Sequence, residues 1–417
     1  MRSRLRGRPI RPSVRATVRR YPTLRRQRPA GRPADIFWPS GRTPLTARRK
    51  NSKRSDADAR ADGSPLRPVI GRVTIRDVAE QAGVSLGTAS NALNRPDKLA
   101  PETLARVHEV IDRLGFVRSS AAHQMRGGNS RCFGAVVLDA SNPFSTETVR
   151  GLEDAVHEQG CAVVVCSTDG SPEREARYLR LLEEQRVQGI VITPATRSIR
   201  HLQTLRDRGT LVVLLDRKSG DRQLCSVSVD HARGGELAAR HLFDLGHRRI
   251  AFINGPLHLS QCSERRRGMR RAARRADLDA DESIVEYTID PITAFEQAES
   301  TVDAFLALPD RPTAVVCVND QIAFTVLRAL AARRVRVPRD ISVVGYDDVD
   351  FAAMLSPTLT SIRQPKYELG RAAAQLLIAE TVDPDHRHGD IRFEPELIER
   401  QSTTARARLS RYSPAGD

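Results

Sequence analysis

VTIRDVAEQAGVSLGTASNALNRPD, residues 73–97, is the stretch that decides the fold of this chain, because it has the spacing of two short helices joined by a glycine turn. Thr74 precedes Asp77 by three residues, as in a helix start at which two side chains cap the backbone. Gly83 favours the left-handed conformation that ends a helix, and Ser85 is a suitable N-cap for the next helix. The stretch therefore predicts a helix-turn-helix.

The second helix of this motif, expected over residues 86–93, is the one that would enter a DNA major groove. A third helix is expected from Pro101, with apolar residues on one face until Gly115. Residues 83–87 also match G-x-S-x-G, the nucleophile elbow of serine hydrolases. That elbow requires a strand before the serine, whereas an amphipathic helix precedes it here, so we interpret Ser85 as a helix cap.

Beyond residue 130, short apolar runs alternate with amphipathic helical stretches. FGAVVLD, AVVVCST, GIVITP and LVVLLD form one series of expected parallel strands, and RIAFING, AVVCVND and ISVVGYD form a second. Two such series predict an α/β fold with two lobes, and open parallel sheets bind ligands at the carboxyl ends of their strands. Polar residues follow directly after three of these runs, namely Asp216, Asn319, Asp320 and Asp347. We expect them to converge on a ligand with several hydroxyl groups.

The positive charge of the chain is concentrated at its N-terminus. The chain has 417 residues, 40% of them hydrophobic, which is enough for a large core and an additional small domain. Its net charge is +16. Residues 1–72 hold 21 Lys and Arg against 4 Asp and Glu, so the remainder carries about −1. We expect either a disordered basic tail or a start placed too far upstream in the gene. No apolar stretch predicts an export signal or a membrane span.

Cysteine and histidine patterns predict no metal site and no cofactor. The six cysteines stand singly without CxxC pairs, which indicates reduced thiols in a cytoplasmic protein. His241 and His247 lack partners at metal spacing, and we interpret them as structural residues. No phosphate loop, dinucleotide fingerprint or triad is present, so no catalytic residue is predicted.

Residues 73–126 resemble the headpiece of the lactose repressor (LacI/GalR) family of bacterial transcription regulators. The resemblance continues through SNPF, EEQRVQGIVI, HLFDLGHRRIAFING, VNDQIAF, DISVVGYDDV, LTSIRQPKYELG and ELIERQST. It implies a periplasmic-binding-protein-like effector domain whose chain crosses between the lobes several times. The expected division is a tail over 1–72, a helix-turn-helix over 73–118, a hinge helix and linker over 119–130, a two-lobed domain over 131–403 and a flexible tail over 404–417.

In the headpiece, the resemblance places Leu86 and Gly87 at the base-reading start of the recognition helix. Leu86 can touch a thymine methyl, Gly87 has no side chain to offer, and Asn91 can pair with adenine or with a phosphate. The residues expected to contact DNA in the helix-turn-helix are Thr74, Leu86, Gly87, Thr88, Ser90 and Asn91, with Thr88 and Ser90 on phosphate oxygens.

The hinge helix that the resemblance implies over residues 119–126 would enter the minor groove and wedge Met125 between base pairs, with Ala122 as the small residue that lets it sit deep. Such a short helix is marginal in water, so we expect it to fold only on DNA and in a dimer. Arg118 and Ser119 stand where the family has proline and asparagine. The alternative is a solvated linker.

In the large domain, the resemblance assigns contacts with a small-molecule effector to strand-end and cleft residues. These are Asp216, Arg265, Asn319, Asp347 and Gln364, with Phe144 as an apolar wall, and we add Asp320. Arg266 or Arg267 could replace Arg265, and the acids could instead cap turns. The only tryptophan, Trp38, lies in the tail, so the pocket has no indole platform for a sugar ring.

We therefore expect a homodimeric or tetrameric repressor without membrane contact that binds a palindromic operator in double-stranded DNA. A carbohydrate or a similar effector would change lobe closure and thereby the spacing of the two headpieces. Two alternatives stay open: a solute-binding protein that delivers a sugar to a transporter, and an enzyme on an α/β scaffold. The headpiece argues against the first, and the missing catalytic motifs argue against the second.

Overall fold

The computed structural model describes residues 73–117, 130–220, 223–289, 294–383 and 385–406. The predicted basic tail, the hinge helix with Ala122 and Met125, and the chain after residue 406 lie outside the described residues. Among the helices of the described ranges, none is both long and apolar enough to cross a membrane.

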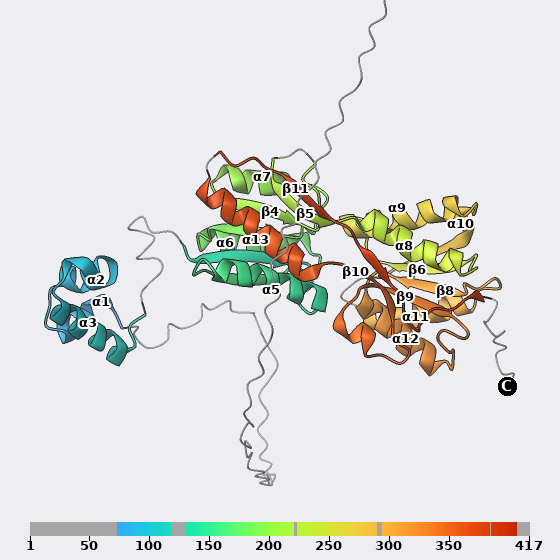
Figure 1. Ribbon diagram of the computed structural model, residues 1–417, viewed down its shortest axis with the longest axis horizontal. Helices are drawn as coiled ribbons and strands as arrows, with labels where there is room; N and C mark the ends of the chain where they lie inside the picture. Colours follow the sequence, from blue (N-terminus) through green and yellow to red (C-terminus); the bar gives the residue numbers. More distant parts are fainter. Residues whose placement is uncertain (1–72, 118–129, 221–222, 290–293, 384, 407–417) are drawn as a thin grey trace, which may run out of the picture. The chain divides into compact units, whose positions relative to one another are not determined.

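Three helices and one 3-10 turn form the headpiece: α1 Ile75–Gln81, α2 Leu86–Asn94, η1 Pro96–Lys98 and α3 Pro101–Leu114 (Figure 1). The expected capping box begins α1. The Thr74 hydroxyl accepts a hydrogen bond from the backbone N–H of Asp77 at 3.4 Å, and the Asp77 carboxylate accepts one from the backbone N–H of Thr74 at 2.7 Å. Two orphan donors of the helix start are thereby satisfied.

Ser85 begins α2 as a cap, because its Oγ accepts a hydrogen bond from the backbone N–H of Thr88 at 3.0 Å. Gly83, in the turn between α1 and α2, and Gly115, at the end of α3, both adopt the left-handed conformation, with φ of 63° and 62°. The three helices enclose a small core of buried side chains: Val78, Ala82, Ala92, Val107 and Val110. The predicted helix-turn-helix and the interpretation of Ser85 as a cap are confirmed.

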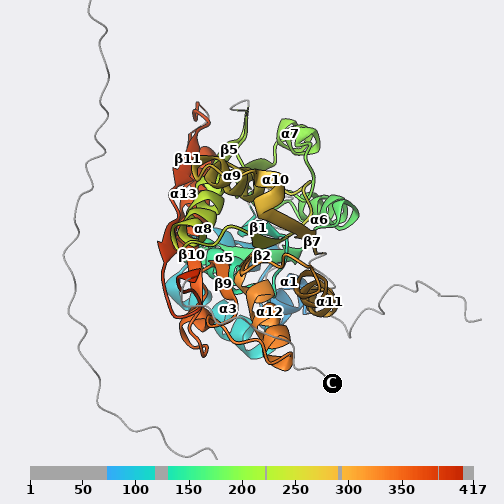
Figure 2. The ribbon, with the colours of Figure 1, turned by 90° about the vertical axis from the view of Figure 1, so that its right-hand side faces the viewer.

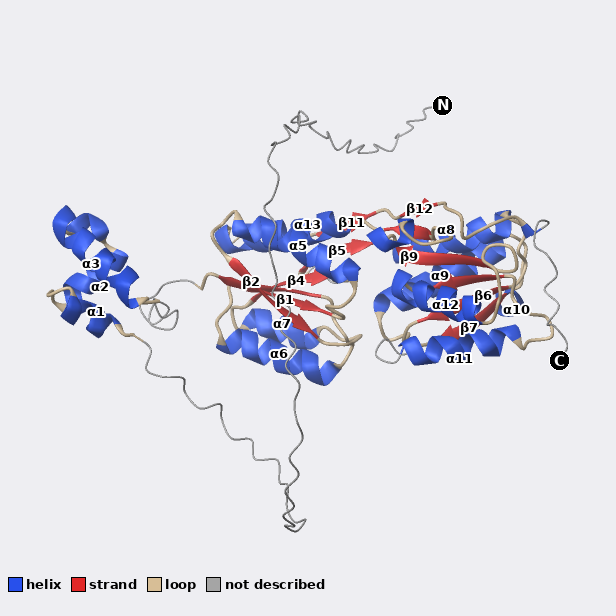
Figure 3. Ribbon diagram, turned by 90° about the horizontal axis from the view of Figure 1, so that it is seen from below, coloured by secondary structure: helices blue, strands red, loops and turns tan. Residues whose placement is uncertain are grey.

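Lobe 1 contains a six-stranded parallel sheet in the order β11-β5-β4-β3-β1-β2. Its strands are β1 Cys132–Val137, β2 Ala162–Ser167, β3 Gly189–Ile192, β4 Leu211–Leu215, β5 Cys225–Val229 and β11 Asp390–Phe393. Helices cover both faces (Figure 3), with α5 Pro143–His157 and α13 Lys366–Val382 on one and α6 Pro172–Glu184 and α7 Arg200–Asp207 on the other.

Lobe 2 contains a second six-stranded sheet in the order β12-β10-β9-β8-β6-β7, in which only β12 is antiparallel. Its strands are β6 Ile250–Asn254, β7 Ile284–Thr288, β8 Ala314–Cys317, β9 Ser342–Asp347, β10 Thr360–Arg363 and β12 Glu396–Ile398. Its helical segments are α8 His231–Asp244, α9 Ser260–Arg275, α10 Ala280–Ser283, α11 Ala294–Leu306, α12 Asp320–Ala332 and η3 Asp350–Ala353. The predicted α/β class with two lobes of parallel sheets is confirmed.

The chain crosses between the lobes three times, as the resemblance implied. It passes from β5 to α8 at Asp230, from β10 to α13 at residues 364–365, and from β11 to β12 at residues 394–395. Residues next to these crossings can therefore touch both lobes.

Strand β2 differs from the fully buried strand that its apolar run suggests. It is an edge strand, and Val164 and Val165 remain 43% and 45% exposed. An apolar run therefore predicted the strand correctly, but its position at the edge of the sheet depends on pairings between distant segments.

Candidate functional site

The outer side of α2 presents two residues that the headpiece does not use for its own structure. Leu86 is 48% exposed and is not part of the headpiece core. The Asn91 carboxamide has no hydrogen-bond partner among the described residues. By contrast, the Thr88 hydroxyl lies 2.9 Å from the Ser85 hydroxyl, and Ser90 accepts a hydrogen bond from the Asn94 amide. Thr74 is committed to capping α1, and Gly87 offers only its backbone.

A cavity of about 580 Å³ lies between the two lobes. The carboxyl ends of strands from both sheets line it, as the rule for open parallel sheets predicts. These strand ends contribute Leu138, Ser167, Thr193, Asp216, Gly255, Ile289, Val318 and Asp347. The structure thus brings five of the seven predicted effector-binding residues, from both lobes, to the lining of one cavity: Phe144, Asp216, Arg265, Asn319 and Asp347.

Arg265 is buried in the lining of this cavity, where two glycines let α8 and α9 approach closely. A Cβ on Gly268 would overlap the carbonyl of Ala232, and one on Gly235 would overlap the carbonyl of Arg265. The Arg265 guanidinium stacks on the Tyr346 ring, 3.6 Å from its centroid, and donates to the Val318 carbonyl. Its Nε is buried without a partner among the described residues, so one donor remains available.

The two neighbouring arginines are placed differently. Arg266 is 40% exposed and pairs with Glu286 at 2.6 Å, and Arg267 is 63% exposed. Of the three arginines, only Arg265 lines the cavity.

Asp216 follows β4 in a left-handed conformation with φ of 58°, and it is 5% exposed. His231 at the start of α8 donates from Nε2 to the Asp216 carboxylate at 2.5 Å. Burial alone would raise the pKa of Asp216, but the charge and hydrogen bond of His231, together with Arg265, hold that pKa below its usual value. Asp216 is therefore a carboxylate acceptor at neutral pH.

Asp347 ends β9 with φ of 108°, a conformation that residues with a Cβ rarely adopt. The buried Gln364 amide, which does not line the cavity, donates to its carboxylate at 2.7 Å. Burial raises the pKa of Asp347 to about 6, against the opposing charge of Arg265 and the hydrogen bond from Gln364. Backbone strain at two facing acids, Asp216 and Asp347, is typical of a ligand site.

Asn319 and Phe144 stand on opposite lobes of the cavity. The Asn319 side-chain oxygen caps α12 by accepting a hydrogen bond from the backbone N–H of Ile322 at 2.9 Å. The cap does not use the Asn319 side-chain N–H groups. Phe144 is half-buried at the start of α5. Close by, the Gln321 amide donates to the Ser141 carbonyl at 3.4 Å, a direct contact between lobes.

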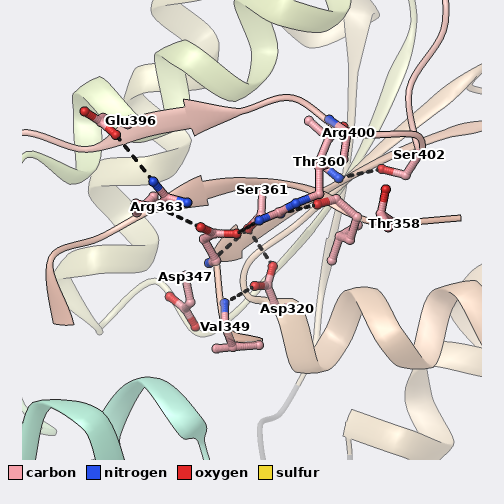
Figure 4. Close-up of polar contacts among 12 residues, drawn as sticks. Asp320, Asp347, Val349, Thr358, Thr360, Ser361, Arg363, Glu396, Arg400 and Ser402 are labelled. Atoms are coloured by element: carbon pink, nitrogen blue, oxygen red, sulfur yellow. Dashed lines mark hydrogen bonds and ion pairs between the residues drawn. The ribbon is translucent and has the colours of Figure 1, made fainter. Parts of the chain in front are cut away.

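Asp320 does not line the cavity and is fully buried in lobe 2, beside Ser361 and Val349 (Figure 4). Its carboxylate accepts from the Ser361 hydroxyl at 2.7 Å and from the backbone N–H of Val349 at 2.9 Å, so it caps the turn after β9. Burial and the nearby Asp347 carboxylate raise the pKa of Asp320 to about 8. The structure does not bring Asp320 to the predicted effector site.

The neighbouring Asp348 belongs to the same network. Arg363 and Arg400 pair with its carboxylate at 2.7 and 2.6 Å, and Arg363 also faces Glu396 of β12 at 4.0 Å (Figure 4). These ion pairs join β9, β10 and β12 beside two of the crossings, so Asp348 stabilises the wall that carries Asp347.

The sequence analysis missed His231 and Tyr346, which hold Asp216 and Arg265. His231 lies two residues after the end of β5 and Tyr346 directly precedes Asp347, so their positions along the chain were informative. A second cavity of about 380 Å³ borders Asp216 and His231 and is lined by basic side chains, among them Arg197, Arg217 and Lys218. The larger cavity collects far more strand ends and is the candidate effector site.

His241 and His247 are structural, as interpreted from the sequence. His247 is fully buried, with Nδ1 2.8 Å from the Thr313 hydroxyl, and burial lowers its pKa to about 4. His241 Nε2 lies 3.0 Å from the Thr403 hydroxyl.

A helix-turn-helix joined to a two-lobed ligand-binding domain defines a class of DNA-binding transcription regulators. Comparison with known proteins agrees. The sequence model for bacterial regulatory proteins of the lacI family matches residues 74–119, and the model for a periplasmic binding protein-like domain matches residues 239–403.

The HTH-type transcriptional repressor PurR of Vibrio atlanticus (strain LGP32) is 33% identical over 332 residues, which cover 79% of this chain and 98% of PurR. The structure of the lac repressor dimer bound to operator and the anti-inducer ONPF is 26% identical, with a TM-score of 0.67 over 80% of this chain and 100% of that one. A LacI family regulator from Enterococcus faecium with bound ribose is 27% identical, with a TM-score of 0.60 over 66% and 99%.

The chain belongs to the LacI family of bacterial regulatory proteins. It is a DNA-binding transcriptional repressor with a site for a small-molecule effector.

Proposed function

We propose that the protein binds a two-fold symmetric operator as a homodimer and that a neutral, hydroxyl-rich effector in the 580 Å³ cavity controls this binding. The observation that carries the proposal is the group of three buried charged side chains, Asp216, Arg265 and Asp347, that line this one cavity. Burying charged groups costs free energy of folding, so three buried charges that line one cavity indicate a site for a polar ligand.

The chemistry of the wall favours an uncharged ligand with hydroxyl groups. Arg265 already faces Asp216 and Asp347, so its charge is largely balanced within the protein. The carboxylates can accept hydrogen bonds from hydroxyl groups, and the free Nε of Arg265 can donate to a hydroxyl or ring oxygen. Phe144 supplies an apolar surface against which a ring could lie. The bound ribose of the Enterococcus faecium relative supports this class of ligand.

Dimerisation is proposed on two grounds. The lac repressor relative binds its operator as a dimer. In this chain, the edge strand β2 leaves Val164 and Val165 exposed, and an apolar sheet edge of this kind is a common pairing surface. A dimer with two headpieces would require two half-sites related by a two-fold axis.

The proposed DNA contacts remain those predicted from the sequence. Leu86 and Asn91 would read bases, and Gly87 would allow close backbone approach. Thr88 and Ser90 would contact phosphates, whereas Thr74 already donates to the Asp77 carboxylate and would act at the DNA surface as the cap that positions α1. Met125 and Ala122, outside the described residues, would act in the minor groove at the centre of the operator. The protein would work in the cytoplasm, where chromosomal DNA is accessible.

We expect no turnover of the effector. The Asp216–His231 pair resembles part of a catalytic triad, but the other His231 nitrogen faces the Tyr346 hydroxyl and Arg265 Nη2, each at 3.4 Å. No nucleophile is therefore placed on this histidine.

Selection of DNA from a random duplex pool with the purified protein tests the proposal. We expect enrichment of a palindrome, with one protein dimer per duplex by light scattering. Enrichment of an asymmetric half-site bound by a monomer would contradict the dimer, and no enrichment would contradict sequence-specific binding.

A further inference from the structure

Four potential metal ligands meet at the end of lobe 1 opposite the effector cavity. Cys225 is the first residue of β5, Glu380 belongs to the last turns of α13, and His386 and His388 lie on the segment that leads into β11. Strand β11 lies beside β5 (Figures 1 and 2), and the backbone N–H of Ser226 donates to the Gly389 carbonyl at 3.0 Å. The strand register therefore brings the two histidines to the cysteine.

The distances between the ligand atoms are close to those of a tetrahedral site, so small side-chain shifts would bring all four onto one ion. Cys225 Sγ lies 3.1 Å from His386 Nε2 and 3.6 Å from His388 Nδ1, and His388 Nδ1 lies 3.9 Å from Glu380 Oε1. All four ligand atoms are within 4.8 Å of one another. With bonds of about 2.0–2.3 Å, adjacent ligands of a tetrahedral Zn²⁺ ion stand roughly 3.3–3.8 Å apart.

The burial of the group gives an independent reason to expect a cation. The Glu380 side chain is only 8% exposed, and its Oε2 has no hydrogen-bond partner among the described residues. An unpartnered buried carboxylate oxygen is costly, and a metal ion would satisfy it. Cys225 is fully buried, whereas His386 and His388 are part-exposed, so an ion could reach the site through the histidine side.

We propose that Cys225, Glu380, His386 and His388 bind one Zn²⁺ ion in a closed, structural site. Thiolate, imidazole and carboxylate suit this borderline-soft ion, and four protein ligands leave no open position for catalysis. The thiolate and the carboxylate would balance its charge. The ion would fasten residues 385–389 to β5 and α13, and so fix the strand that leads into the third crossing between the lobes.

The test uses the untagged full chain, reduced and freed of metal by a chelator. Titration with Co²⁺ should produce a thiolate-to-cobalt charge-transfer band and the strong visible bands of tetrahedral Co²⁺, saturating at one ion per chain. Zn²⁺ should displace the cobalt and raise the Tm, because an ion that binds only the folded state stabilises it.

Cys225→Ser should abolish the charge-transfer band and weaken Co²⁺ binding by more than about 100-fold, and His388→Ala should weaken it by a similar factor. Cys166→Ser, at the half-buried end of β2, and His157→Ala, at the exposed last residue of α5, are matched controls that should leave binding unchanged. If Cys225→Ser fails to fold, His386→Gln replaces it as the test, because His386 is part-exposed and its loss should weaken Co²⁺ binding by a similar factor.

Two results would overturn the proposal. One is wild-type protein that takes up neither Co²⁺ nor Zn²⁺. The other is uptake without a thiolate band and without sensitivity to Cys225→Ser or His386→Gln, which would mean adventitious binding by surface histidines.

Discussion

The headpiece and the effector cavity carry their working side chains in opposite environments. On α2, Leu86 is 48% exposed, and the headpiece core beneath it consists of small buried side chains. The cavity is lined by three charged side chains that are at most 6% exposed, Asp216, Arg265 and Asp347, and the arginine attracts both carboxylates electrostatically. A substitution on α2 should therefore change DNA binding with little effect on stability, whereas one in the cavity disturbs both ligand binding and the surrounding electrostatics.

The largest effect is expected from Arg265→Ala in the cavity. Removing one member of a buried charged group typically costs on the order of 2–5 kcal/mol of binding free energy, so effector affinity should fall more than about 30-fold. Asp216 and Asp347 would also lose their buried counter-charge, and the Tm should drop. Calorimetry measures the affinity, and Arg267→Ala, at an exposed arginine two residues further along α9, is the matched control. Undiminished effector affinity in Arg265→Ala would place the site elsewhere.

Asn91→Ala tests the exposed side of the comparison. If Asn91 reads a base, operator affinity should fall by roughly 1–3 kcal/mol while affinity for random duplex and the Tm stay unchanged. Asn94→Ala, at the end of the same helix and engaged with Ser90, serves as control. An equal loss on operator and random duplex would reassign Asn91 to a phosphate.

The pH dependence of effector binding tests the buried cavity, through the ionisation of Asp347. Because the pKa of Asp347 is raised to about 6, its carboxylate is ionised at pH 7 and protonated at pH 5. Effector hydroxyls should bind the ionised form better, so affinity should fall by about tenfold between pH 7 and pH 5. Asp347→Asn should bind weakly with no such pH dependence. A wild-type affinity that rises toward pH 5 would contradict this assignment.

The smallest effect is expected from Ser85→Ala, which removes the cap of α2. Loss of an N-cap costs about 1 kcal/mol, so amide hydrogen exchange in residues 86–94 should accelerate about fivefold. Ser85→Thr should restore protection, and effector binding should not change in either variant. Unchanged exchange would mean that the 3.0 Å hydrogen bond to Thr88 contributes nothing.

The sequence predicted the headpiece more completely than the cavity, for a physical reason. Helix caps and glycine turns depend on residues a few positions apart, so Thr74, Ser85 and Gly83 could be read directly. The strand-end rule also predicted Asp216 and Asp347. It failed to separate Asn319, which lines the cavity, from Asp320, which points into lobe 2, because side-chain direction depends on tertiary packing.

Long-range register explains what the sequence could not show. Cys225 is 161 residues from His386, and only the pairing of β5 with β11 brings them together. The same holds for His231 and Tyr346, 115 residues apart. Of the three adjacent arginines, Arg265 became distinguishable only once the close packing of α8 against α9 was known.

The central claim is that the buried cavity and the exposed α2 surface are coupled, and a thermodynamic cycle tests it most directly. A panel of pentoses, hexoses and disaccharides, starting with ribose, is screened for a sugar that raises the Tm of the wild type but not of Arg265→Ala. The Kd for operator is then measured with and without that sugar, and the Kd for the sugar with and without operator. We expect both ratios to agree at about 5- to 150-fold and to collapse to one in Arg265→Ala. A sugar that binds the cavity and leaves operator affinity unchanged would contradict the account.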